Sequence, residues 1–183
     1  GGLVNSKTDS AIQGGSEKDS SKNLSGNFNA EKWINDNIKF RANAYSRRTI
    51  SEYDSSSTIE EDYKGDNLMY VAQFGFDHIK KNLKDYLTFH FHQYDRIYNE
   101  GGVIDNYLSN AFFTRSERKI QLDDRLSLGF GGEYKYDWGK FENRGSYTAS
   151  TKGHAYNTGI FSNVGFKPLK NTTFSVFGRS DIH

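Results

Sequence analysis

Residues 125–138 read RLSLGFGGEYKYDW, and this stretch decides the fold. Apolar or aromatic side chains stand at every second position, and the residues between them are polar or small. The apolar row is Leu126, Leu128, Phe130, Tyr134, Tyr136 and Trp138, with Gly132 filling its gap. A period of two predicts a β-strand with one apolar face and one polar face. Soluble strands usually stop after roughly five or six residues, whereas a strand that crosses a bilayer needs about ten.

The overall composition supports a membrane barrel. Mean hydropathy is −0.82, which is very hydrophilic, yet the 183 residues include 14 Phe and 12 Tyr. A disordered chain would lack these aromatic residues. A membrane barrel has both properties, because half of each strand faces water while aromatic side chains gather on the lipid side.

Charge and cysteine content exclude several other classes of protein. The 24 Lys and Arg against 23 Asp and Glu give a net charge of +1, with no basic block, so we expect no nucleic-acid partner. The absence of Cys excludes disulfides, thiolate metal sites and a cysteine nucleophile. The sequence contains no run of about 18 apolar residues, so it predicts no transmembrane helix.

Alternation like that of the opening stretch recurs along the chain, and we interpret it as about eight strands. Short turns are predicted at 35–37, 81–84, 123–124 and 167–171, and long polar loops at 1–22, 54–67, 98–110 and 143–153. Short and long connections would then alternate, as periplasmic turns and extracellular loops do in outer-membrane barrels. The segment 1–22 is therefore expected to be an extracellular loop.

We expect one apolar row from several strands to form the convex, lipid-facing surface of the sheet. Its predicted members are Leu126, Leu128, Phe130, Tyr134, Phe74, Phe89, Phe91, Ile160, Val164, Phe166, Phe174 and Val176.

The C-terminal residues YNTGIFSNVGFKPLKNTTFSVFGRSDIH resemble a strand pair of TonB-dependent outer-membrane receptors. In that family, an Asn-Thr-Gly-aliphatic-aromatic strand precedes one that ends in Arg-x-Asp, often with a His. The stretch LSLGFGGEYKYDW resembles the preceding family strand, of the form Gly-x-Gly-x-Glu. The order of hairpins is most similar to the cobalamin-transporter branch, and the specific motifs are confined to residues 126–183.

This resemblance implies an all-β fold: an antiparallel up-and-down transmembrane β-barrel segment that forms an open arc of a larger barrel. It implies a Gram-negative outer-membrane location, lipid contact, and active uptake of a small-molecule nutrient such as cobalamin or a metal chelate. Residues 1–183 would be a partial barrel, because the family's plug domain and its energy-coupling box are not found in them. A TonB-type coupling protein would act through the missing plug.

Candidate site residues follow from the same comparison. Residues that share a strand face with the Arg-x-Asp motif would line the lumen and meet the plug. They are Arg179, Asp181, Glu133, Lys135 and Asn157. No resident cofactor is expected. Asp19, Asp54 and Asp62 lie in neighbouring outward loops, and their carboxylates are candidate calcium ligands, although the spacing of an EF-hand is absent.

Three further motifs carry weaker functional hypotheses. His90 and His92 share a strand face and could chelate a transition metal, but the sequence fixes no third ligand nearby. RSDIH at 179–183 holds Ser, Asp and His, but alternation places Ser180 on the opposite face from Arg179 and Asp181. GFGG at 129–132 lies inside a strand and lacks the spacing of a phosphate-binding loop. We therefore expect no enzyme activity.

Two alternative folds remain open at this point. One is a complete small outer-membrane barrel of about eight strands. The other is a soluble all-β domain that binds surfaces, such as a sandwich. For the partial barrel, we expect unpaired edges at the terminal strands, near 24–34 and 172–181.

Overall fold

The computed structural model describes residues 2–7, 20–53, 63–145, 148–169 and 171–183. These residues form nine strands in one sheet and no helix, so the all-β prediction is confirmed. The strands are β1 (Gly2–Lys7), β2 (Ser20–Asn35), β3 (Ile38–Tyr53), β4 (Tyr63–Lys80), β5 (Leu83–Glu100), β6 (Val103–Gln121), β7 (Leu126–Arg144), β8 (Ala149–Leu169) and β9 (Thr172–Ile182).

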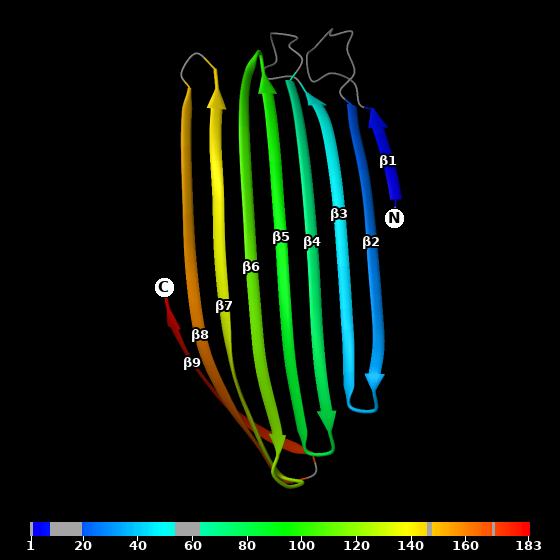
Figure 1. Ribbon diagram of the computed structural model, residues 1–183, viewed down its shortest axis with the longest axis vertical. Coiled ribbons are helices and arrows are strands. Elements are labelled where there is room, and N and C mark those ends of the chain that lie inside the picture. The colour runs from blue at the N-terminus through cyan, green and yellow to red at the C-terminus, as the bar shows by residue number, and fades with distance from the viewer. Residues whose placement is uncertain (1, 8–19, 54–62, 146–147, 170) are drawn as a thin grey trace.

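The sheet is an up-and-down meander in which every strand pairs antiparallel with its neighbours in sequence (Figure 1). Pairing between β4 and β5 runs without a register shift from Lys64↔Asn99 to Lys80↔Leu83. Among the described residues, β1 and β9 do not pair with each other. The sheet is therefore an open arc, which contradicts the alternative of a small closed barrel.

Two turns at the lower end of Figure 1 are closed by side chains that accept backbone hydrogen bonds. Asn35 Oδ1 accepts from the amides of Asn37 and Ile38, at 3.0 and 2.9 Å. Asp123 Oδ1 does the same for Arg125 and Leu126, at 2.7 and 2.8 Å. Asn and Asp favour tight turns for this reason, and the turns predicted at 35–37 and 123–124 are confirmed. β5 already begins at Leu83 and β8 continues to Leu169, so the connections predicted at 81–84 and 167–171 are shorter than expected.

The predicted long loop at 98–110 is wrong. β5 continues to Glu100 and β6 begins at Val103, so that only Gly101 and Gly102 connect them. Both glycines have positive φ, 56° and 88°, as a two-residue hairpin turn of type I′ requires. The Gly-Gly pair is itself a hairpin signal, and the polar residues around it are strand residues that alternate between the faces.

The other predicted loops are also shorter than expected. Gly2–Lys7 is strand β1 and β2 starts at Ser20, so residues 1–22 are not simply an extracellular loop, and β1 is the first edge strand. β4 already begins at Tyr63, inside the predicted loop 54–67. β7 extends to Arg144 and β8 starts at Ala149, within the predicted loop 143–153. These strand ends carry polar residues, because they extend beyond the apolar band.

The predicted apolar row lies on one face of the sheet, which we call the outer face. Cross-strand partners show this directly: Leu126 pairs with Phe166, Leu128 with Val164, and Phe74 with Phe89. Eight of the twelve predicted residues are exposed, and the other four are partly exposed. In Figure 1, β9 runs behind β7 and β8, so the sheet curls away from the viewer and the outer face is convex.

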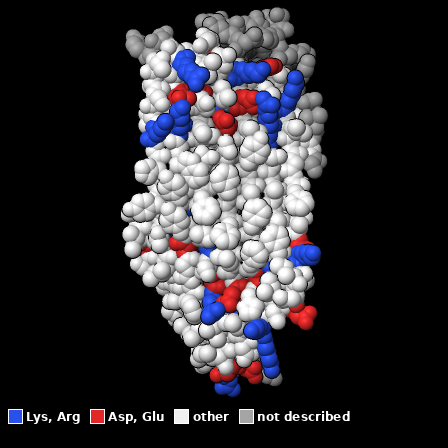
Figure 2. All heavy atoms as spheres, in the orientation of Figure 1, with Lys and Arg blue, Asp and Glu red and all other residues white. Residues whose placement is uncertain are grey.

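Figure 2 shows a broad uncharged band across the outer face, with Lys, Arg, Asp and Glu gathered above and below it. On β5 the band lies between Asp85 and Asp95, ten positions apart. That spacing corresponds to about 33 Å of strand and, at a tilt near 40°, to about 25 Å along a membrane normal. This height equals the apolar band of outer-membrane barrels.

The described residues contain almost no hydrophobic core. Ala42, Ala111 and Phe161 are the buried apolar residues among them, and none of the large side chains described is fully buried. A sandwich would cover the apolar face with a second sheet, which the described part of the chain does not do, so that alternative is also contradicted. In the same residues, no helix is long and apolar enough to cross a membrane.

Candidate functional site

The five predicted lumen residues all lie on the polar, concave face, which we call the inner face. Glu133 on β7 and Asp181 on β9 both pair with Gly159 of β8, so the register places their side chains on the same side. Lys135 pairs with Asn157 one step along. Arg179 pairs with Phe161, which lies two residues from Gly159 in the opposite direction along β8. Strand register therefore brings together residues that are about fifty positions apart in sequence.

Arg179 is the centre of a charge network. Its Nη2 and Nε donate to Asp181 Oδ1 and Oδ2, at 2.7 and 2.8 Å, and it also forms an ion pair with Glu133. Glu133 lies 3.6 Å from Arg115 of β6, which in turn lies 3.1 Å from Glu117. The Glu133 side chain is 11 % exposed. The network therefore links β6, β7 and β9 across the inner face and satisfies a carboxylate that is largely withdrawn from water.

Two further polar pairs extend the network along the strands. Lys135 Nζ lies 2.8 Å from Asp137, and Asn157 Nδ2 lies 2.7 Å from His183 Nδ1. These pairs sit nearer to the end of β9, where the network is more exposed to solvent. All five predicted lumen residues thus make polar contacts on the inner face, three of them in the Arg179 network and two in these separate pairs.

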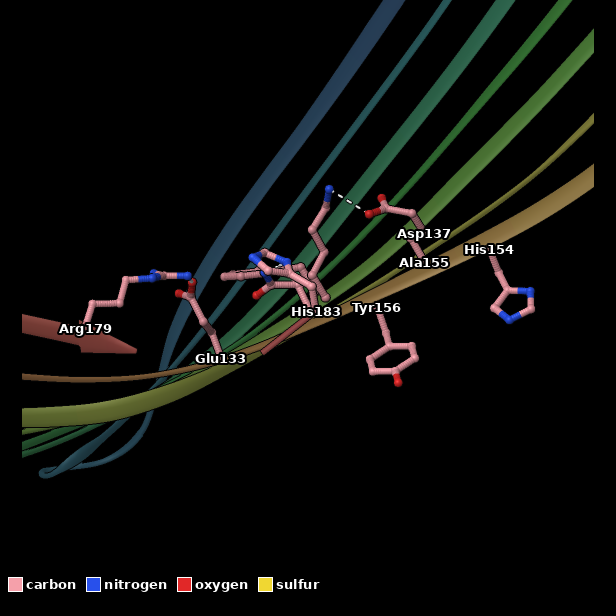
Figure 3. A pocket seen from close by; sticks show the side chains of 10 residues that line it. Glu133, Asp137, His154, Ala155, Tyr156, Arg179 and His183 are labelled. Carbon is pink, nitrogen blue, oxygen red and sulfur yellow. Dashed lines mark hydrogen bonds and ion pairs between the residues drawn. The ribbon is translucent and has the colours of Figure 1, made fainter. Parts of the chain in front are cut away.

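An open hollow of about 680 Å³ lies over these contacts. In Figure 3, the Arg179, Glu133 and His183 side chains project from the concave side of the sheet, and those of Tyr156 and His154 project from the opposite side. The hollow reaches both sets because β9 ends at Ile182, next to Thr158, and leaves the rest of β8 uncovered at its edge. Its inner lining offers charged donors and acceptors, which can hold polar groups of a ligand or of a protein segment.

Glycines make room for this network. A Cβ at Gly131 would lie 2.3 Å from the Ser116 carbonyl oxygen and 2.6 Å from Phe161 Cζ. The space instead admits the Phe161 ring, over which the Arg115 guanidinium lies 4.4 Å from the ring centroid. GFGG therefore lies inside strand β7, as predicted, and Gly131 permits a close approach of the neighbouring strand and ring.

Sequence reasoning missed Arg115 and Phe161 as members of the site. Arg115 lies in TRSERK at 114–119, where charges at consecutive positions obscure the alternation of a strand. In the structure these charges sort by face: Arg115 and Glu117 point inward, and Arg118 points outward to Asp85 at 2.6 Å. Strict alternation through the charged residues is the signal that could have found them.

A second inner-face cluster lies near the ends of β5, β6 and β7, in the region mistaken for a loop. Tyr107 contacts Tyr98 and Phe141, with ring centroids 6.4 and 4.6 Å apart. The Arg96 guanidinium lies 4.1 Å from the centroid of Tyr98. The inner face therefore carries an aromatic patch at the strand ends farthest from the turns at Asn35 and Asp123.

The predicted metal sites have different outcomes. Asp19, Asp54 and Asp62 lie outside the described residues, so the calcium hypothesis stays a prediction. His90 and His92 do share the inner face, with ring centroids 6.5 Å apart. Within the described ranges, no group of three or more His, Asp or Glu side chains is placed to hold a metal ion.

The RSDIH motif does not form a catalytic triad. Ser180 pairs with Ile160 on the outer face, whereas Asp181 lies on the inner face, bound to Arg179. Asp181 therefore cannot orient a base toward Ser180.

The sequence matches no protein-family model and no curated protein sequence. Solved structures do match its fold. The copper transporter OprC superposes with a TM-score of 0.75 and 11 % identity, over 98 % of this chain and 31 % of that one. The alcaligin outer-membrane receptor FauA of Bordetella pertussis gives 0.69 and 8 %, over 92 % and 30 %. The ferric yersiniabactin uptake receptor FyuA of Yersinia pestis gives 0.62 and 13 %, over 92 % and 29 %.

The chain spans about a third of the length of these structures. The superpositions establish the fold. The open arc, its apolar convex face and its match over nearly the whole chain agree on one architecture. The chain has the fold of a nine-stranded segment of the barrel of TonB-dependent outer-membrane receptors.

Proposed function

We propose that this chain is part of a TonB-dependent receptor in the outer membrane of a Gram-negative bacterium. The receptor imports a scarce nutrient, a metal ion or metal chelate, with cobalamin as one candidate. One observation carries the proposal. The arc is apolar over about 25 Å on its outer face and charged on its inner face, and 98 % of this chain superposes on part of a copper transporter. The ferric yersiniabactin uptake receptor supports the same class of cargo.

In this function the chain binds and steers, and no covalent bond is made or broken. Outer loops capture the nutrient, a plug supplied by the rest of the receptor closes the lumen, and a TonB-type protein moves the plug. Arg179, Asp181, Glu133, Lys135 and Asn157 form the part of the wall that meets the plug. Calcium bound by Asp19, Asp54 and Asp62 would order the outer loops.

The pairing of charges on the inner face fits a plug that must come away. Arg179 already has two carboxylate partners in the barrel wall, so departure of the plug leaves no buried charge unpaired. The Asp181 side chain is 29 % exposed and the Lys135 side chain 50 %, so both can still contact a plug. Contacts of this kind are weak individually and reversible.

The proposal is tested by deleting the gene that encodes these residues and measuring uptake of radiolabelled Cu²⁺, ferric siderophores and cobalamin. We expect loss of saturable uptake for one of them, and restoration when the intact gene is returned. Because TonB coupling uses the proton gradient, a protonophore should abolish the same uptake. Unchanged uptake of all three would overturn the proposed function.

The location is tested separately by membrane fractionation. The intact gene product should sediment with the outer membrane and should migrate faster on a gel before boiling than after it, as folded barrels do. Recovery in the soluble fraction would contradict the membrane assignment.

A further inference from the structure

Two histidines stand side by side in the middle of β5, on the inner face. His90 pairs with Gln73 of β4 and Phe113 of β6, and His92 pairs with Val71 and Ala111. β5 is the central strand of the nine, far from both edges of the arc (Figure 1). The pair therefore lies in the middle of the arc, far from β9 but next to the β6 end of the Arg179 network, where Arg115 pairs with Thr88.

The geometry of the two rings suits chelation of one metal ion. Their centroids are 6.5 Å apart, and their planes are nearly perpendicular, at 85°. A metal about 2.0 Å from each ring nitrogen would hold the centroids roughly 5 to 6 Å apart, so a small rotation of the side chains closes the pair. Both side chains are partly exposed and, among the described residues, neither has a hydrogen bond or ion pair that occupies its nitrogens.

The surroundings of the pair can accept a cation, because the positive side chains near it are paired with carboxylates. Three cations near the pair on this face already have carboxylate partners. Arg115 is paired with Glu117 and Glu133, Arg41 with Asp77 at 2.7 Å, and Lys135 with Asp137 at 2.8 Å. Additional soft or neutral donors lie next to the pair. Gln73 is the direct cross-strand partner of His90, and Met69 faces Tyr94, one step beyond His92.

We propose that His90 and His92 bind a divalent late first-row transition-metal ion, Cu²⁺ above all, on the lumen wall. Imidazole ligands suit Cu²⁺, Ni²⁺ and Zn²⁺, and affinity at such sites peaks at Cu²⁺. With only two imidazole ligands the remaining positions go to water, to Met69, or to Gln73 Oε1 in exchange for its 3.4 Å hydrogen bond from Asn43, so the ion exchanges readily. If the proposed uptake function holds, this site is a transit point for a metal ion that crosses the barrel.

The test uses the full-length product of the gene, purified in detergent and stripped of metal with a chelator. Cu²⁺ is titrated against a competing chromophoric chelator, and the electron paramagnetic resonance spectrum of the bound ion is recorded. The His90→Gln and His92→Gln variants should each weaken binding at one site at least tenfold and remove the hyperfine signal of two nitrogens. His154→Gln is the matched control, since His154 projects from the opposite side (Figure 3), and it should bind like the wild type.

A measurement on the unmutated protein guards against variants that fail to fold. Bound Cu²⁺ should protect His90 and His92, but not His154, from modification by diethyl pyrocarbonate, as read by mass spectrometry. Equal copper affinity in the wild type and both variants, or no protection, would overturn the metal site. This outcome is separable from failure of the uptake function, because copper binding is measured on purified protein without transport.

Discussion

The outer and inner faces of the arc are built from the same strands but follow different rules. On the outer face the band is defined by what is absent: from Leu126 to Trp138, no outward residue of β7 carries a charge. On the inner face of the same strand, Glu133, Lys135 and Asp137 follow one another, each with a charged partner. Lipid tolerates many apolar side chains but no charge, whereas a wet lumen tolerates charge but requires pairing where space is limited.

This difference teaches where each face can change. The outer face is specified by polarity alone, so Phe, Tyr, Leu and Val replace one another along it. The inner face is specified by shape as well, because Gly131 sits directly under the Phe161 ring and Gly159 under the Asp181 and Arg179 side chains. We therefore expect substitutions that change polarity to lower stability most on the outer face, and substitutions that change side-chain volume to lower it most on the inner face.

The largest expected effect comes from a charge placed in the apolar band. Phe74 is 47 % exposed on the outer face, between the charged ends of β4. Phe74→Arg should lower the free energy of unfolding by about 2–4 kcal/mol, as measured for Arg near the midplane of barrel strands. Guanidinium unfolding of the full-length product in lipid vesicles, followed by tryptophan fluorescence, measures this change.

Gln73→Arg is the matched control, at the same depth of β4 but on the inner face. Its expected effect is within about 1 kcal/mol, because the new guanidinium stays in water. Equal destabilisation by both substitutions would show that the two faces do not differ in polarity as argued.

A change of volume should have an intermediate effect, and only inside. Gly131→Ala adds a Cβ that would meet the Ser116 carbonyl oxygen and the Phe161 ring, so strands or ring must shift. We expect a loss of about 1–3 kcal/mol of unfolding free energy, the usual effect of overpacking. The same denaturant series measures it.

Gly153→Ala is the comparison for that substitution. A Cβ at Gly153 meets nothing within 4 Å, and Gly153, like Gly131, is an odd-numbered strand position on the inner face. Replacement should leave stability within about 0.5 kcal/mol of the wild type or raise it slightly, since Ala restricts the unfolded chain. A large loss at Gly153 would argue against the steric explanation.

The sequence predicted the two faces better than the connections. All twelve residues assigned to the convex face share it, because a period of two permits no other arrangement once the strands form. The loop at 98–110 was wrong because polar residues at strand ends resemble loop residues when the strand extends beyond the membrane. The Gly101–Gly102 turn was the more reliable signal.

The candidate site was predicted as a face but not as a network. Alternation places Glu133, Lys135 and Arg179 on the inner side, yet it says nothing of which charge meets which. Arg115 joins Glu133 only through the pairing of β6 with β7, a long-range register that a single sequence does not display. Contacts along one strand, such as Arg179 with Asp181, were within reach of sequence reasoning.

The smallest expected effect concerns the charge pairs themselves. Glu133→Gln removes the carboxylate that links Arg115 to Arg179, and its side chain is only 11 % exposed. We expect a loss of about 1 kcal/mol in unfolding free energy, reduced by the fact that Arg179 keeps Asp181. Lys135→Gln breaks a pair with Asp137 in which both side chains are at least 41 % exposed, so it should change stability by less than about 0.5 kcal/mol. A larger loss from Lys135→Gln than from Glu133→Gln would refute the view that inner-face pairing matters most where water is excluded.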